Sequence, residues 1–239
     1  MNEISQDLFI LGIPVDTPIG KCHFLKMKDY NEYAAYLDLI KMSKNEIVYR
    51  YSQLNKSGEL NNLIEEMKKL PLFDIVNQLP NFNEAYSEVF KKGFQNDTVF
   101  ELIDRNNFNS IRKLFLEMHC LKEEKISPNP EVQRRIEQSK RLKQQEQEPL
   151  EVYDMISSIA TFAGISYKEI AEMTLYQMYM TFYRISCFKD YDTAILFATV
   201  SPEAGKNIKH WSSHVDLFEE ESHALSDEQV KNLKRLFQD

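Results

Sequence analysis

The sequence has little glycine and contains no recognisable catalytic motif. Six glycines among 239 residues leave no room for a phosphate-binding or dinucleotide-binding loop, because such loops need clustered glycines for close backbone approach. Few glycines and eight prolines also favour helices with short connections over a large antiparallel sheet. We therefore expect a mainly α protein that is not an enzyme, holds no cofactor and works by binding.

Basic residues are also in deficit, with 29 Lys and Arg against 37 Asp and Glu and a net charge of −8. Phosphate binding needs a surplus of Lys and Arg, so a general affinity for nucleic acid or for an anionic membrane is not expected. The N-terminus lacks the basic start and long apolar run of a signal peptide, and no window approaches about 18 apolar residues. These absences predict a soluble protein without a membrane span.

The three cysteines, Cys22, Cys120 and Cys187, are far apart and odd in number. Such a set is no disulfide framework and suits a reducing cytoplasm. Cys187 lies within an apolar helical pattern, where inert buried cysteines are common, so it is not expected to act as a nucleophile.

Residues 1–121 are predicted to form a small α+β module. The apolar run 8–13 (LFILGI), the turn 16–20 (DTPIG) and the alternating stretch 21–28 (KCHFLKMK) predict a β-hairpin. From Asp29 onward, apolar residues recur with helical spacing, which predicts a helix.

The rest of this module is predicted to be largely helical. Residues 46–54 (EIVYRYSQL) are ambiguous between a strand and a helix, and their Tyr, Val and Ile content favours the strand. Residues 59–120 predict a run of short amphipathic helices. For one of these helices, Asn81 or Asn83 is the expected cap and Gly93 the expected end.

Residues 122–149 have few apolar side chains and many charged ones, which predicts a polar linker between two modules. Within it, Asn129 as a cap and Pro130 in the first turn favour a solvated helix over residues 130–146. A basic strip along this helix is the one feature that suits nucleic acid, although interleaved Glu and Gln weaken it: Arg134, Arg135, Lys140, Arg141 and Lys143.

Residues 150–239 are predicted to form a C-terminal helical bundle of four or five helices. Gly164 is a natural residue to end the first of them. Residues 191–200 are apolar enough to be buried. Ser201 and Ser226 are expected to cap two further helices, the first of which continues through residues 208–218.

Two capping boxes give this stretch its clearest local structure. Ser166 with Glu169, and Thr174 with Gln177, have the spacing at which the hydroxyl accepts from the third amide and the third side chain returns to the cap amide. Two helix starts eight residues apart predict a short helix, a sharp corner and a longer helix. We expect that longer helix to break or bend at Lys189–Asp190.

The longer helix is dense in methionine and aromatic residues. Methionine adapts its shape and aromatic rings supply contact area, so these side chains suit either the protein's own core or a grip on an apolar partner helix. Together with one residue of the next predicted helix, the predicted partner-binding residues are Tyr176, Met178, Tyr179, Phe182, Tyr183 and Trp211.

The histidines of the C-terminal part are not expected to form a metal site. His210 and His214 are spaced to share a helix face, and His223, Cys187 and the acidic run 219–221 lie nearby in sequence. No HExxH or paired CxxC motif accompanies them, so surface or capping roles are favoured over metal ligation.

The order of helix, corner and helix over residues 167–186 also suits a helix-turn-helix. The second helix of that motif presents polar and basic side chains to the major groove. Here it carries mainly Met and aromatic residues, with Arg184 as its one basic residue. Nucleic acid is therefore a disfavoured partner, and a DNA-binding regulator is kept as a second alternative.

Three consecutive segments, MTLYQMYMTFYRI (173–185), KDYDTAILFATVS (189–201) and IKHWSSHVDLF (208–218), carry a family resemblance. Their order resembles the C-terminal helical part of tail assembly chaperones from tailed phages of Gram-positive bacteria. The polar linker is longer than in the shorter members of that family.

The resemblance implies a non-enzymatic protein of the host cytoplasm. It would coat the tape measure protein and help to recruit tail tube subunits, with self-association as a further interaction. The first alternative is a structural component of the phage tail or baseplate.

Overall fold

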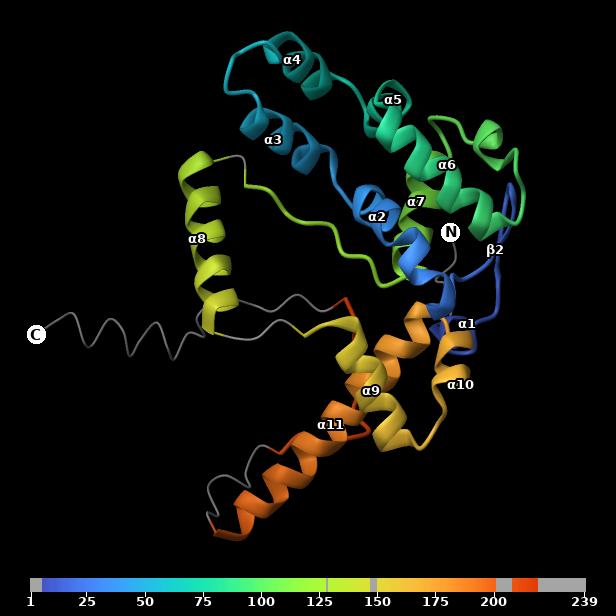
Figure 1. The fold of residues 1–239 in the computed structure, drawn as a ribbon, viewed down its shortest axis with the longest axis vertical. Helices are drawn as coiled ribbons and strands as arrows, with labels where there is room; N and C mark the ends of the chain where they lie inside the picture. The colour runs from blue at the N-terminus through green and yellow to red at the C-terminus, as the bar shows by residue number, and fades with distance from the viewer. Residues whose placement is uncertain (1–5, 128, 147–149, 201–207, 219–239) are drawn as a thin grey trace, which may run out of the picture.

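A computed structural model describes residues 6–127, 129–146, 150–200 and 208–218 (Figure 1). In this part the chain is mainly helical, with a two-stranded hairpin near the N-terminus. The predicted fold class, mainly α with a small N-terminal hairpin, is therefore confirmed. The division into modules at residues 121 and 149 stays a prediction.

The hairpin consists of β1 (Val15–Thr17) and β2 (Gly20–Cys22), paired antiparallel with Val15 opposite Cys22. The Thr17 hydroxyl closes the turn, because it donates to the Gly20 carbonyl at 2.7 Å and accepts from the Ile19 amide at 3.3 Å. The hairpin thus begins later in the chain than the sequence pattern indicated.

The apolar run 8–13, predicted as the first strand, lies largely in the short helix α1 (Gln6–Ile10). Phe9 from this helix is buried and packs edge to face on Phe24 and Tyr176, with ring centroids 5.6 and 5.4 Å apart. The strand prediction was wrong because a short apolar run does not distinguish a buried strand from a buried helix.

A helical body follows the hairpin, with α6 at its centre between α2, α5 and α7 (Figure 1). Its elements are η1 (Met27–Asp29), α2 (Tyr30–Ile40), α3 (Lys44–Leu54), α4 (Asn61–Lys69), α5 (Leu72–Gln78), α6 (Pro80–Phe94), η2 (Val99–Leu102) and α7 (Phe108–Met118).

The stretch 46–54, predicted as a strand, is part of the helix α3. The Ser43 hydroxyl caps this helix by accepting from the Glu46 amide at 3.2 Å. Ile47 is buried whereas most of the later positions face solvent. A cap and one-sided burial therefore outweigh the strand preference of Tyr, Val and Ile.

Helix α6 differs from its predicted ends. Pro80 occupies its first turn after a cap at Leu79, and the helix ends at Gln95, whose φ of 53° is left-handed. Gly93, the expected end, lies within the helix. A Cβ there would be 2.7 Å from Cε2 of Phe115, so this glycine permits close packing of α7 on α6.

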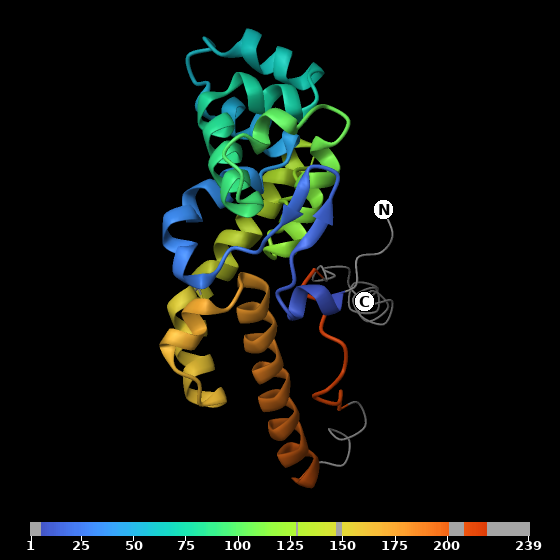
Figure 2. The same ribbon diagram turned by 90° about the vertical axis from the view of Figure 1, so that its right-hand side faces the viewer.

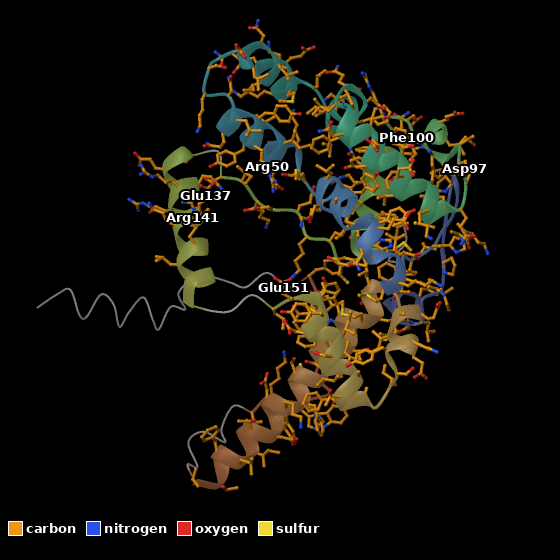
Figure 3. The ribbon with its side chains drawn as sticks, viewed as in Figure 1. Arg50, Asp97, Phe100, Glu137, Arg141 and Glu151 are labelled. Atoms are coloured by element: carbon orange, nitrogen blue, oxygen red, sulfur yellow. The ribbon has the colours of Figure 1, made fainter. Side chains whose placement is uncertain are left out.

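The predicted solvated helix is confirmed as α8 (Pro130–Glu146), which begins where the Asn129 carboxamide oxygen accepts from the Glu131 amide at 2.9 Å. The Tyr49 hydroxyl of α3 donates to Glu137 on α8. Figure 3 labels Arg50 on α3 and Glu137 and Arg141 on α8, the two helices that this bond connects. The helix is therefore anchored at one side.

The C-terminal part contains α9 (Val152–Ala163), α10 (Tyr167–Glu172) and α11 (Leu175–Val200). Gly164 ends α9 with a φ of +67°. Both predicted capping boxes are confirmed. Glu169 and Gln177 return to the cap amides at 2.8 and 2.9 Å, and their own amides donate to the cap hydroxyls at 3.3 and 3.1 Å.

Two predictions for the end of the chain are wrong. Helix α11 continues through Lys189–Asp190 to Val200, since residues 175–200 contain no proline or glycine to stop it. Residues 208–218 form turns and irregular backbone instead of a helix, and His210 Nδ1 and the Ser212 hydroxyl bond locally at 2.7 Å. The helix starts expected at Ser201 and Ser226 lie outside the described residues.

The corner between α10 and α11 is tied to the N-terminal segment. The Met27 amide donates to the Met173 carbonyl at 2.9 Å, and the Leu175 amide donates to the Leu25 carbonyl at 3.3 Å. The Gln177 side chain also donates to the Ile10 carbonyl at 2.9 Å. Segments far apart in sequence thus share one core, which extends from Phe9 to Leu217 among the described residues.

Replacing Thr174 with alanine is expected to lower the free energy of unfolding by about 1–2 kcal/mol, because the lost cap lies at this buried corner. Ser166→Ala, in the exposed box, should cost about 0.5–1 kcal/mol. Urea unfolding of both variants measures the difference. An equal or larger loss for Ser166→Ala would contradict the assigned importance of the corner.

Candidate functional site

The predicted partner-binding residues fall into two groups in the structure. Tyr176 and Met178 are 3% and 0% exposed and pack in the protein's own core. Tyr179 and Phe182 are half-buried, whereas Tyr183 and Trp211 are exposed. The start of α11 therefore holds the molecule together, and binding by the other side chains stays a prediction.

Tyr179 and Tyr183 line a cavity of about 340 Å³ at the base of α11, together with Tyr30 of α2 and Leu217. Burial raises the pKa of Tyr179 to about 12 and the pKa of the Cys120 thiol, which also lines the cavity, to about 12. Both groups are therefore neutral near pH 7, so neither supplies a nucleophilic anion.

Beyond the cavity, α11 extends further than α9, the helix that packs against it. Helix α9 packs along α11 and ends at Ala163. Near that end, Lys189 Nζ lies 4.8 Å from the centroid of the Phe162 ring. Residues 190–200 then extend beyond α9 by roughly 16 Å of helix at 1.5 Å per residue. Figure 2 shows this part, named here the projecting end, as the lower end of the long helix, below the end of α9.

One stripe runs along α11 at every third or fourth residue, and it is apolar except at Lys189 and Thr193. Its members are Leu175, Met178, Phe182, Ile185, Lys189, Thr193, Leu196 and Val200. Its first half is buried or half-buried where α9 packs against α11. On the projecting end, Leu196 and Val200 are 69% and 80% exposed, and Phe197 beside them is 61% exposed. The burial predicted for residues 191–200 is therefore wrong, because α9 stops before it reaches them.

The side of α11 away from α9 is covered by residues 208–218 (Figure 2). The rings of Phe188 and Trp211 meet at 5.9 Å, and those of Tyr191 and His210 at 5.2 Å. Arg184 donates to the carbonyls of Trp211 and Ser213 at 2.6 and 2.8 Å. This segment therefore leaves the stripe uncovered among the described residues.

The same geometry argues against the helix-turn-helix alternative. A recognition helix contacts bases through its N-terminal residues. Here Leu175, Tyr176 and Met178 are at most 3% exposed, and Arg184 is already engaged with backbone carbonyls.

No group of three His, Cys, Asp or Glu side chains suited to a metal ion occurs in the part of the chain that the structure describes. His223 and the acidic run 219–221 lie outside that part, so the expected lack of a metal site stays a prediction. None of the described helices is long and apolar enough to cross a membrane.

No sequence pattern predicted a role for Arg112, yet its side chain is buried and all three guanidinium nitrogens donate hydrogen bonds. Its guanidinium donates to the Tyr86 hydroxyl at 2.7 Å, to Glu123 at 2.6 Å, and to the carbonyls of Ile40 and Met42 at 2.9 and 3.0 Å. It thereby joins the end of α2 to α6, α7 and the segment after α7.

His119 is a second buried polar group without a sequence signal. Its Nε2 accepts from the Leu25 amide at 2.8 Å, and its Nδ1 donates to the Phe115 carbonyl at 2.7 Å. Burial lowers the pKa of His119 to about 4, so the ring is neutral near pH 7. Since both nitrogens have partners, this histidine is a structural link between residue 25 and α7.

The described part of the chain is thus mainly helical, with the candidate residues gathered on and around α11. Profiles of the YomV N-terminal domain and the YomV second domain match residues 2–128 and 143–216. The chain therefore belongs to the YomV family.

One relative is the SPbeta prophage-derived uncharacterized protein YomV of Bacillus subtilis (strain 168). It is 44% identical over 238 residues, which cover 99% of each chain. This likeness points to a phage-derived protein family. No solved structure matches the chain.

Proposed function

We propose that the protein is a non-enzymatic phage tail assembly chaperone that holds an apolar helical segment of a tape measure protein in the host cytoplasm and helps to recruit tail tube subunits. The observation that carries the proposal is the uncovered stripe on the projecting end of α11. The phage-derived family and the resemblance of residues 173–218 to tail assembly chaperones support it.

The chemistry of the projecting end suits such a partner. Leu196, Phe197 and Val200 repeat with helical spacing, and an amphipathic helix binds a groove through apolar residues of the same spacing. Exposed apolar patches of this kind mark interaction surfaces. Residues 193–200 carry no charged side chain, so an apolar helix meets no unpaired charge there.

Co-expression of the tagged chain with the tape measure and tail tube proteins of the same phage tests the proposal. We expect the tape measure protein to co-purify, and Leu196→Asp with Val200→Asp to weaken its retention by about 100-fold, since each lost contact contributes about 1.5 kcal/mol. Leu54→Asp, at a leucine that is 74% exposed on α3, is the matched control and should retain binding.

Failure to retain either tail protein would contradict the chaperone function. Detection of the chain by mass spectrometry in purified phage particles, at the copy number of a tail component, would instead assign it to the tail or baseplate structure.

A further inference from the structure

The stripe on the projecting end has an internal symmetry. Its outer positions, Lys189, Thr193, Leu196 and Val200, are separated by four, three and four residues. Reversing the helix direction maps this spacing onto itself, with Lys189 opposite Val200 and Thr193 opposite Leu196. In a two-fold symmetric interface residue i of one copy contacts residue j of the other and the reverse, and an antiparallel pair in this register meets that condition.

We infer that the projecting ends of two copies of this chain pair antiparallel, so that the free protein is a dimer joined through α11. In this dimer, α9 of one copy covers the stripe as far as Lys189, and the projecting end of the other copy covers the rest. The pairing does not rest on the proposed function, and a client helix would compete with it for the same side chains.

The pairing extends a packing that the chain already makes. Helix α9 covers the stripe as far as Lys189, where Phe162 is still 55% exposed. In the antiparallel alignment, Val200 of the second copy arrives at this point and covers the end of α9. The second copy thus takes the place that a longer α9 would occupy.

The contact area indicates a weak dimer. Phe162, Leu196, Phe197 and Val200 are 55–80% exposed. Large apolar side chains exposed to this extent contribute roughly 100 Å² each, so these four give on the order of 400 Å² per copy. Stable interfaces bury about 800 Å² per partner, so we expect a dissociation constant on the order of micromolar.

Charge does not oppose the pairing. Residues 193–200 are uncharged, so no like charges meet at the centre of the contact. Asp190 and Asp192 are exposed at the inner end of each copy, opposite the uncharged tip of the other.

Sedimentation of the full chain from about 1 to about 200 µM tests the association. We expect monomer to convert to dimer over this range, Leu196→Asp to raise the dissociation constant by at least tenfold, and Leu54→Asp to leave it unchanged. Unchanged far-UV circular dichroism verifies that each variant folds. A monomer throughout, or a dimer that Leu196→Asp leaves intact, would overturn the inference and leave the stripe to residues 219–239 or to another protein.

Cysteine cross-linking tests the direction of the helices. In a Cys187→Ser background, Lys189→Cys and Val200→Cys variants should cross-link under mild oxidation when mixed, because the two positions are opposite each other. Neither variant should cross-link with itself, because its two copies lie roughly 16 Å apart along the helix axis. Cross-linking of either variant alone, without cross-linking of the mixture, would overturn the antiparallel pairing.

Discussion

Replacing Arg112 with methionine is expected to lower the free energy of unfolding by about 3–5 kcal/mol, because it removes one partner of a buried ionic network. The guanidinium satisfies two carbonyls at the end of α2, a buried tyrosine hydroxyl and a glutamate. Methionine fills similar volume but donates nothing, so the Tyr86 hydroxyl and the Met42 carbonyl stay buried without this donor, whereas Glu123 is exposed. Urea unfolding at pH 7 measures the loss.

Lys113→Met is the matched control, since Lys113 is the next residue of α7, is 78% exposed and lies 3.7 Å from Glu117. Its expected change is within about 0.5 kcal/mol. Arg112→Lys should fall between the two, because an ammonium cannot reproduce the planar fork of donors. If Arg112→Met and Lys113→Met unfold at the same urea concentration, the network does not stabilise the fold as assigned.

Acidification from pH 7 to pH 4 is expected to remove about 3 kcal/mol of stability through His119 alone. The pKa of His119 is about 4 in the folded protein, against about 6.5 in an unfolded chain. Between these values the unfolded state binds a proton that the folded state does not. The contribution is therefore fully present above about pH 6.5 and is lost as the pH falls to about 4.

His119→Gln isolates this effect, because glutamine does not titrate and its carbonyl oxygen can accept from the Leu25 amide. We expect the variant to be less stable than the parent at pH 7, and the difference to shrink by about 2–3 kcal/mol at pH 4. His210→Gln, at an exposed histidine, should retain the parent's dependence on pH. A constant difference between His119→Gln and the parent would contradict a neutral buried His119.

Features set by neighbours in sequence could be predicted. The boxes at Ser166 and Thr174 and the start of α8 at Asn129 depend on bonds between residues two or three apart, so the residue pattern defines them. Segments 8–13 and 46–54 were predicted wrongly, because their composition suits both a strand and a helix, and packing on distant residues decided between them.

The candidate site was predicted only in part. The Met and aromatic content of α11 predicted a binding role for this helix, which stays a prediction. Burial of Tyr176 and Met178, and exposure of Leu196 and Val200, depend on where α9 and the N-terminal segment lie against that helix. All four side chains belong to one helix of similar composition, so no local pattern separates those in the core from those at the surface.

The sequence by itself determined a mainly helical chain, the helix starts at Asn129, Ser166 and Thr174, and the sharp corner at Met173–Thr174, because capping and helical periodicity act over a few residues. Tertiary structure alone decided that this corner pairs with residues 25–27, that Arg112 and His119 bond to backbone groups 70 or more residues away, and that α11 outruns α9. These outcomes depend on the lengths and packing of separate elements, which local patterns do not encode.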